Sequence, residues 1–264
     1  MGSANRASLT PSLSLGFMSR VDQALVERGL CASREQAKRA VMAGRVRING
    51  RAARKPSDTV QPLDSVAVEA PERYVSRGGY KLEHALEHFR LDVTGQVAID
   101  LGASTGGFTD CLLQRGAARV YAVDVGKGQL AWKLRQDPRV TVIEGVNARS
   151  LSASQLPAPF ATAGMVVIDC SFISLRKILP SAVELLAPGG IIVALIKPQF
   201  EAGRAEADRG GGVITDPRVH ERVVSELRSY VDECGRLRWR EVVESPLRGP
   251  AGNREFLVLL EKIG

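Results

Sequence analysis

The feature that most constrains the fold is a short apolar run that turns sharply at a glycine and passes through small residues into a helix. The run Val97–Leu101 is followed by Gly102-Ala103-Ser104-Thr105-Gly106-Gly107, and the pattern predicts a helix from Thr109 to about Gln114. Glycines let the backbone approach a ligand closely, and the first N–H groups of a helix are free to bind it. This strand, turn and helix start therefore predict a binding site for a nucleotide-like ligand.

A second apolar run, Val120–Asp124, ends in an acid. In a doubly wound sheet, an acid about 20 residues beyond the glycine turn holds the hydroxyls of a ribose. The turn lacks the G-x-G-x-x-G spacing of dinucleotide-binding folds, and no Gly-Lys-Ser/Thr follows that would indicate a phosphate loop. Its D-x-G-x-x-x-G-G form, which starts at Asp100, together with Asp124 resembles the S-adenosylmethionine site of class I methyltransferases. On this motif alone, a Rossmann-like unit with another ligand remains the alternative.

The basic residues are concentrated near the start of the chain. The 264 residues carry a formal net charge of +7. Residues 18–60 hold ten Lys/Arg against four Asp/Glu, whereas the 204 residues after them hold 25 of each sign. A strongly basic module on a neutral body predicts a polyanionic partner.

Several protein classes are disfavoured by the composition. Residues 1–17 are Ser-rich without a sustained apolar core, so we expect a disordered leader and not a signal peptide. No apolar run approaches the roughly 18 residues of a membrane helix. The four cysteines are scattered singly, which argues against a disulfide scaffold or a cysteine-based zinc site and fits a reducing cytoplasm.

Residues 18–70 have the pattern of two short helices and a hairpin. Ser19 is expected to cap a helix from Arg20 to about Arg28. Ser33, with Gln36 three residues later, is expected to cap a second helix that ends at Gly44. Alternation around Asn49-Gly50 predicts a β-hairpin.

The same module resembles the S4 RNA-binding fold. The resemblance is carried by Arg20-x-Asp22, by Ser33-Arg34-x-x-Ala37, and by Gly44-x-Val46-x-Ile48-Asn49-Gly50. It implies an RNA-binding face formed by Arg20, Arg34, Lys38, Arg39 and Arg47. A solvated basic surface without a partner is the alternative.

A linker over residues 71–80 is expected to lead into a helix from about Lys81 to Phe89. His84, Glu87 and His88 in this helix spell H-x-x-E-H, a metalloprotease-like string. Nothing downstream offers an obvious third ligand, so two partly exposed imidazoles on a charged helix face are the simpler interpretation, and no metal site is predicted.

The βαβ rhythm continues to the end of the chain. Continuous apolar runs predict parallel strands covered on both faces. Further strands are expected at 140–144, 165–169, 191–197, 239–243 and 255–260, with helices at 175–186 and from Asp216-Pro217 to about 231. This order suggests an α/β class I methyltransferase domain over residues 81–264, with a seven-stranded sheet whose last strand is antiparallel.

Four charged residues are expected to meet at one edge of this sheet. Asp169 and Lys197 end strands, Glu255 opens the antiparallel strand, and Lys81 comes from the helix before the first strand. Ligands bind at the carboxyl ends of the strands in open α/β sheets. A lysine that closes a buried strand is costly unless it is paired or functional.

This set resembles the K-D-K-E tetrad of FtsJ-like RNA ribose 2′-O-methyltransferases. With the S4-like module, Ser76-Arg77-Gly78-Gly79-Tyr80-Lys81-Leu82, Asp169-Cys170-Ser171-Phe172-Ile173-Ser174-Leu175 and Lys197-Pro198-Gln199-Phe200-Glu201, the chain is similar to the TlyA (hemolysin A) family from about Met18 onward. The resemblance implies methylation of a cytidine ribose in 23S ribosomal RNA, with 16S ribosomal RNA left open as a second target.

The chemistry fits these residue types. Burial and a neighbouring cation favour the uncharged form of a lysine, which can then accept the proton of a ribose hydroxyl. We therefore expect Lys197 to act as the base and Lys81, Asp169 and Glu255 to position it. Asp100 is expected to contact S-adenosylmethionine. The other expected contacts are Gly102, Ser104, Thr105, Gly106 and Gly107 near the methionine moiety, Asp124 at the ribose, and Asn147 and Ala148 at the adenine. Phe108 is expected equally as a core residue or as a cofactor contact.

Other interpretations stay open at this point. The chain could be a non-enzymatic RNA-binding or ribosome-assembly factor, a membrane-active hemolysin, or a base methyltransferase that uses Cys170. The glycine-rich segment 201–216 is expected to form a mobile lid. The expected partner is ribosomal RNA or a ribosomal subunit, and both a monomer and a homodimer are compatible with the sequence.

Overall fold

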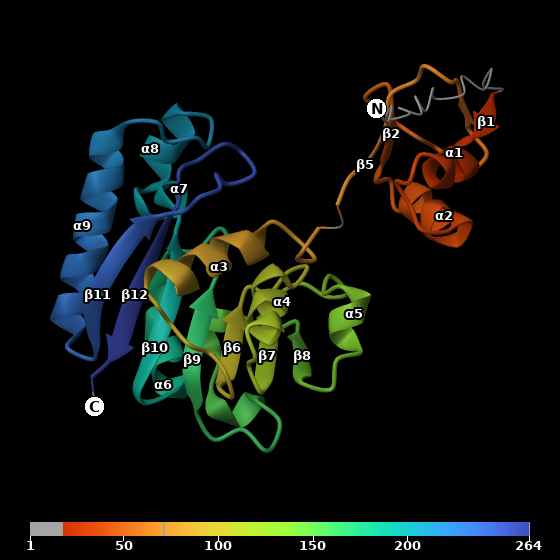
Figure 1. The fold of residues 1–264 in the computed structure, drawn as a ribbon. Helices are drawn as coiled ribbons and strands as arrows, with labels where there is room; N and C mark the ends of the chain where they lie inside the picture. Colours follow the sequence, from red (N-terminus) through yellow and green to blue (C-terminus); the bar gives the residue numbers. More distant parts are fainter. Residues whose placement is uncertain (1–17, 71, 264) are drawn as a thin grey trace, which may run out of the picture. The chain divides into compact units, whose positions relative to one another are not determined.

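The computed structural model describes residues 18–70 and 72–263, so the leader predicted over residues 1–17 lies outside the described part. The chain divides into two compact units, Met1–Glu72 and Arg73–Gly264, called here the first and the second unit. Figure 1 shows their elements.

The first unit packs two helices against short strands. Its elements are β1 (Ser19–Arg20), α1 (Val21–Glu27), α2 (Arg34–Met42), β2 (Val46–Ile48), β3 (Arg51–Ala52), β4 (Thr59–Val60) and β5 (Val66–Val68). β1 pairs with β4, and β2 lies between β3 and β5. The core consists of small and branched apolar side chains such as Val21, Leu25, Ala37 and Val46.

Two of the three local predictions for this unit are confirmed. Ser33 Oγ accepts a hydrogen bond from Gln36 N (3.2 Å) at the start of α2. Asn49 and Gly50 have φ angles of 50° and 78°, as a two-residue hairpin turn requires, and join β2 to β3.

The predicted cap at Ser19 is wrong. Ser19 pairs with Val60 in β1, and α1 begins at Val21 without a side-chain cap. Backbone carbonyls take over that task, because Val21 N donates to Asp58 O (2.8 Å) and Asp22 N donates to Pro56 O (3.2 Å).

The second unit contains a seven-stranded sheet in the order β11-β12-β10-β9-β6-β7-β8. Its strands are β6 (Val97–Leu101), β7 (Arg119–Asp124), β8 (Val140–Glu144), β9 (Ala163–Ile168), β10 (Leu186–Ile196), β11 (Leu237–Glu244) and β12 (Phe256–Lys262). β12 runs antiparallel to both of its neighbours, while the other pairings are parallel. This is the α/β class I methyltransferase architecture expected from the sequence.

Helices cover both faces of the sheet (Figure 1). They are α3 (Gly78–His88), α4 (Gly107–Gln114), α5 (Trp132–Arg135), α6 (Leu179–Leu185), α7 (Pro198–Glu201), α8 (Arg204–Arg209) and α9 (Pro217–Cys234), with 3-10 turns at Ala148–Ser150, Ala153–Gln155 and Leu175–Lys177. Alternate residues of a strand point to opposite faces of the sheet and belong to two cores. Ile99 belongs to the core that includes α6 and α9, and Ala98 to the core that includes α3 and α4. The parallel strands are therefore buried on both sides, which explains their continuous apolar sequences.

Two predicted boundaries need correction. The linker predicted over residues 71–80 is too long, because Tyr74 is 2% exposed in the core and α3 already begins at Gly78. Gly79 packs directly on Tyr74, and a Cβ at this glycine would lie 2.2 Å from the ring. The helix predicted over 175–186 is divided into a 3-10 turn and α6, and Leu186 already belongs to β10, where it pairs with Ala163.

Two members of the histidine-containing string in α3 have polar partners outside the helix. His88 Nε2 lies 2.8 Å from Glu241 Oε1, and Glu87 pairs with Arg115. Among residues 18–70 and 72–263, no cluster of three or more His, Cys, Asp or Glu side chains has the arrangement of a metal site. Within the same ranges, no helix combines the length and the apolar character needed to cross a membrane.

Candidate active site

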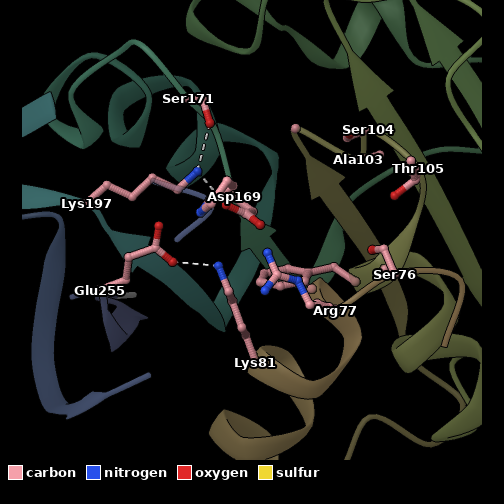
Figure 2. A pocket seen from close by; sticks show the side chains of 15 residues that line it. Ser76, Arg77, Lys81, Ala103, Ser104, Thr105, Asp169, Ser171, Lys197 and Glu255 are labelled. Carbon is pink, nitrogen blue, oxygen red and sulfur yellow. Dashed lines mark hydrogen bonds and ion pairs between the residues drawn. The ribbon is translucent and has the colours of Figure 1, made fainter. Parts of the chain in front are cut away.

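Two lysine–carboxylate pairs with buried amines lie at the edge of the sheet where β6, β9 and β10 end and β12 begins. Lys81 Nζ, from α3, is 2.5 Å from Glu255 Oε2. Lys197 Nζ is 2.7 Å from Asp169 Oδ1 and donates a hydrogen bond to Ser171 Oγ (2.9 Å). Figure 2 shows both pairs facing the same space. The four residues expected from the sequence are thus brought together from four distant parts of the chain.

Burial makes these pairs unusual. Lys81 and Lys197 are each 7% exposed, and Glu255 is 1% exposed. An unpaired charge at such a position would be very costly, so each amine needs its carboxylate. The arrangement holds two amines in fixed places beside a cavity.

The pairs line a cavity of about 270 Å³ together with the glycine turn. Its wall also includes Ser76 and Arg77, just before α3. A larger cleft of about 1400 Å³ shares Lys197, Asp169 and Glu255 and continues past Asp124. The two hollows adjoin, so the edge of the sheet has room for a nucleoside-containing cofactor and for a second ligand.

The turn itself requires glycine at two close approaches. Gly102 has a φ of +87°, and a Cβ there would lie 2.8 Å from the carbonyl oxygen of Asp169. A Cβ at Gly107 would lie 2.3 Å from Ser76 Oγ. The glycines thus bring the turn against the loop after β9 and against the start of α3.

Asp124 is held at the wall of the larger cleft by backbone N–H groups. Ser104 N donates to Asp124 Oδ2 and Gly126 N donates to Asp124 Oδ1, both at 2.7 Å. Each carboxylate oxygen keeps a free lone pair for a ribose hydroxyl. The neighbouring Val125 is 71% exposed and offers an apolar surface at the same place. The cradle of glycines and this acid fit S-adenosylmethionine.

Most of the expected cofactor residues line one of the two hollows. They are Gly102, Ser104, Thr105, Gly107, Phe108, Asp124, Asn147 and Ala148. Phe108 is 3% exposed in the core and also lines the smaller cavity, so its contact with the cofactor stays a prediction.

For Asp100 and Gly106, the prediction of a direct cofactor contact is wrong. Asp100 is fully buried and accepts hydrogen bonds from Thr109 N (2.9 Å) and Thr109 Oγ1 (2.7 Å). Gly106 faces the core, where a Cβ would lie 2.2 Å from Leu134. Asp100 therefore fastens the start of α4 to β6, and Gly106 lets the turn pack on the side chains beneath it.

Asp100 gives a testable pH dependence. Burial raises the pKa of this carboxyl to about 7, above its value in the unfolded chain, although the bonds from Thr109 oppose the shift. Its contribution to stability is therefore fully present below the unfolded pKa and is lost as the pH rises toward 7. We expect Asp100→Asn, which can still accept from Thr109, to flatten the loss of stability over this range. Urea unfolding between pH 5 and about pH 8 measures the slope, and equal slopes for both proteins would contradict the assignment.

Sequence reasoning missed three polar side chains of the smaller cavity. Ser76 and Arg77 were placed in a linker, and Ser171 was only part of a motif. The signal for the first two was the Gly78-Gly79 pair, which starts a helix against the glycine turn. Ser171 could not be found from local sequence, because its bond to Lys197 depends on the pairing of β9 with β10.

The segment expected as a lid contains α8 and borders the larger cleft through Gly203, Asp208 and Gly212. The side chain of Asn253, 2% exposed, ties it down. Asn253 Nδ2 donates to Gly212 O (2.8 Å) and Asn253 Oδ1 accepts from Ile214 N (2.9 Å). One end of the segment is therefore fastened to the turn that carries Glu255; its mobility stays a prediction.

Cys170 is poorly suited to act as a nucleophile. Burial raises the pKa of its thiol to about 12, even though the charge of Lys197 opposes this. The thiol donates to Leu101 O (3.4 Å). A reactive thiolate is therefore strongly disfavoured at this position, which weakens the base-methylation alternative.

Comparison with known proteins gives the family. Residues 74–262 match the model of FtsJ-like methyltransferases, and residues 19–66 match the S4 domain. The chain belongs to the FtsJ-like methyltransferase family. Its matched region begins at Tyr74, one residue after the start of the second unit.

Relatives place the chain in the TlyA (hemolysin A) branch of this family. It is 46% identical to the 16S/23S rRNA (cytidine-2′-O)-methyltransferase TlyA of Mycobacterium tuberculosis, over 92% of this chain and 89% of the relative. It is 39% identical to Hemolysin A of Brachyspira hyodysenteriae, over 90% and 98%. A solved structure from Streptococcus thermophilus, described as a hemolysin, superimposes with a TM-score of 0.70 at 45% identity and covers 93% of this chain and 89% of its own. The resemblance noted in the sequence is confirmed.

Proposed function

We propose that this FtsJ-like methyltransferase transfers a methyl group from S-adenosylmethionine to the ribose 2′-hydroxyl of a cytidine in ribosomal RNA. The observation that carries the proposal is the placement of two lysine–carboxylate pairs, whose amines are buried, on a cavity that adjoins the glycine turn. The name of the mycobacterial relative supports the substrate. An enzyme that acts on ribosomal RNA works where ribosomes are, so we also propose a cytoplasmic location.

The side chains of this site provide an acceptor for the proton that the ribose 2′-hydroxyl loses. A ribose 2′-hydroxyl is a weak nucleophile that loses its proton as its oxygen attacks, and the bound cofactor supplies an electrophilic methyl group. In our proposal Lys197 Nζ accepts that proton, while Asp169 and Ser171 hold the amine in place. Lys81, fixed by Glu255, places a second amine at the same cavity.

Transfer from labelled S-adenosylmethionine to separated, unmodified ribosomal subunits tests the proposal. We expect label in 2′-O-methylcytidine, and mapping identifies the subunit and nucleotide. Measurable cofactor binding without transfer to any RNA would contradict the proposal and favour a non-enzymatic RNA-binding factor. Leakage from liposomes would favour the membrane-active alternative.

The first unit supplies a cationic face for this RNA. The carboxylate of Asp22, fully buried, accepts from Arg20 Nε and from Arg34 Nη2, each at 3.0 Å. One acid thereby holds two half-exposed guanidinium groups side by side. Arg47 pairs with Glu69 (2.8 Å), and Lys38 lies 3.9 Å from Glu35. We propose that Arg20 and Arg34 contact phosphates, together with Lys38, Arg39 and Arg47.

Arg20→Ala and Arg34→Ala test this face. Each variant should weaken RNA binding and reduce the slope of log affinity against log salt by about 1, because each removes one phosphate contact. Arg238→Ala is a matched control, since it removes the same charge from β11, the outermost strand of the second unit. Equal effects of the three variants would show that only net charge matters.

A further inference from the structure

The carboxylate of Glu201, the last residue of α7, uses both oxygens on the loop that follows β9. Ser174 Oγ donates to Glu201 Oε2 (2.6 Å), and Leu175 N donates to Glu201 Oε1 (2.7 Å). Ser174 Oγ in turn accepts from Arg176 N (3.2 Å). One acid thus closes the far end of the loop that begins at Asp169.

The same loop is fastened to α7 at two further points. At its start, Asp169 and Ser171 contact Lys197, the residue that precedes α7. In its middle, the ring centroid of Phe172 lies 5.1 Å from the ring centroid of Phe200. The loop therefore follows one short helix along its whole length, and Glu201 provides the last attachment.

The loop needs such attachments because its backbone is strained. Phe172 has a φ of +64°, a left-handed conformation that bulky residues rarely adopt, and its side chain is 89% exposed. Burial of the ring therefore does not hold this conformation. Strained backbone persists only where the surroundings over-determine it.

We infer that Glu201 is a positioning residue for methyl transfer: it holds the Asp169–Leu175 loop so that Asp169 and Ser171 keep Lys197 Nζ in place. Glu201 lines neither of the two hollows, so it acts through the loop and touches no substrate. The inference rests on the proposed function, because it assigns Lys197 the role of base.

Glu201→Ala and Glu201→Gln separate positioning from bulk stability. Alanine removes both attachments, and a misplacement of about 1 Å at a reacting group can cost up to roughly 100-fold in rate. We therefore expect Glu201→Ala to lower kcat by roughly 10- to 100-fold with unchanged affinity for S-adenosylmethionine. Glutamine can accept from Leu175 N and donate to Ser174 Oγ, so Glu201→Gln should stay close to wild type. Glu184→Gln is the matched control. Glu184 lies on α6, away from the loop, and its carboxylate pairs with Arg236 (2.6 Å).

Hydrogen exchange at the Leu175 amide provides a readout that does not depend on activity. Exchange should accelerate in Glu201→Ala and not in Glu201→Gln. Should Glu201→Ala fail to fold, Ser174→Ala removes the contact to Glu201 Oε2 and the acceptor of Arg176 N while Leu175 N stays bound to Glu201 Oε1, and it is expected to lower kcat.

Three results would overturn the inference: a kcat of Glu201→Ala equal to that of Glu184→Gln, equal impairment by alanine and glutamine, or an unchanged kcat in Ser174→Ala. A wild-type protein without methyl transfer would instead overturn the proposed function, and the exchange rate at Leu175 would still decide whether Glu201 holds the loop.

Discussion

Lys197→Ala is expected to reduce methyl transfer by roughly 10²- to 10⁴-fold, the usual contribution of a general base. The variant removes the amine that lies 2.7 Å from Asp169 Oδ1 and 2.9 Å from Ser171 Oγ, while the glycine turn and Asp124 stay intact. Cofactor affinity should therefore remain near that of the wild type. Single-turnover transfer to a ribosomal subunit, together with calorimetric titration of S-adenosylmethionine, measures both quantities.

Lys262→Ala is a suitable control for this experiment. Lys262 ends β12, the strand that follows Glu255, and its amine donates to Leu186 O (2.6 Å) at the opposite end of the sheet. Its loss should leave transfer intact. Retained turnover in Lys197→Ala would exclude Lys197 as the base, and a loss of cofactor binding in that variant would place its role in the cofactor site.

The second large effect is expected on stability. Glu255→Leu leaves the buried amine of Lys81 without its carboxylate, and breaking a buried ion pair in this way costs about 3–5 kcal/mol. Adding Lys81→Met replaces the pair by apolar side chains of similar volume, so the double variant should recover most of the lost stability. Both proteins should lack methyl transfer, because the second cation is displaced or absent.

Unfolding in urea measures these stabilities in the second unit alone. Both tryptophans of the chain, Trp132 and Trp239, belong to that unit, so their fluorescence follows its transition. A cost below about 1 kcal/mol for Glu255→Leu would indicate that water or another carboxylate replaces the lost partner. An equal cost for the single and the double variant would contradict coupling between the two residues.

The strands of the second unit could be predicted from sequence because they are buried on both faces. Their apolar runs mark where each strand begins and ends, and Val97–Leu101 and Val140–Glu144 have the expected bounds. Asp169, Lys197 and Glu255 could be placed at one edge because the ends of parallel strands meet there. Lys81 was grouped with them because its helix precedes the first strand, and the family resemblance supported that placement.

The remaining features depend on contacts between distant segments. The first N–H groups of α1 are satisfied by carbonyls of residues 56 and 58, which made the local cap signal at Ser19 misleading. The side chain of Asp100 lines neither hollow, because it is buried against Thr109 at the start of α4. Glu201 was grouped with a predicted lid, and only the packing of α7 against the loop after β9 gives it another role.

The contact between Gly102 and the carbonyl of Asp169 limits how this enzyme could be re-engineered for bulkier methyl-donor analogues. Any side chain introduced at Gly102 to reshape the pocket would push on the backbone of a residue that pairs with Lys197. A substitution at Gly102 that changes cofactor preference would therefore also displace Asp169 and lower reactivity. Space for a larger donor would have to come from residues such as Val125 and Ala148, which border the larger cleft and do not line the smaller cavity that holds the lysine pairs.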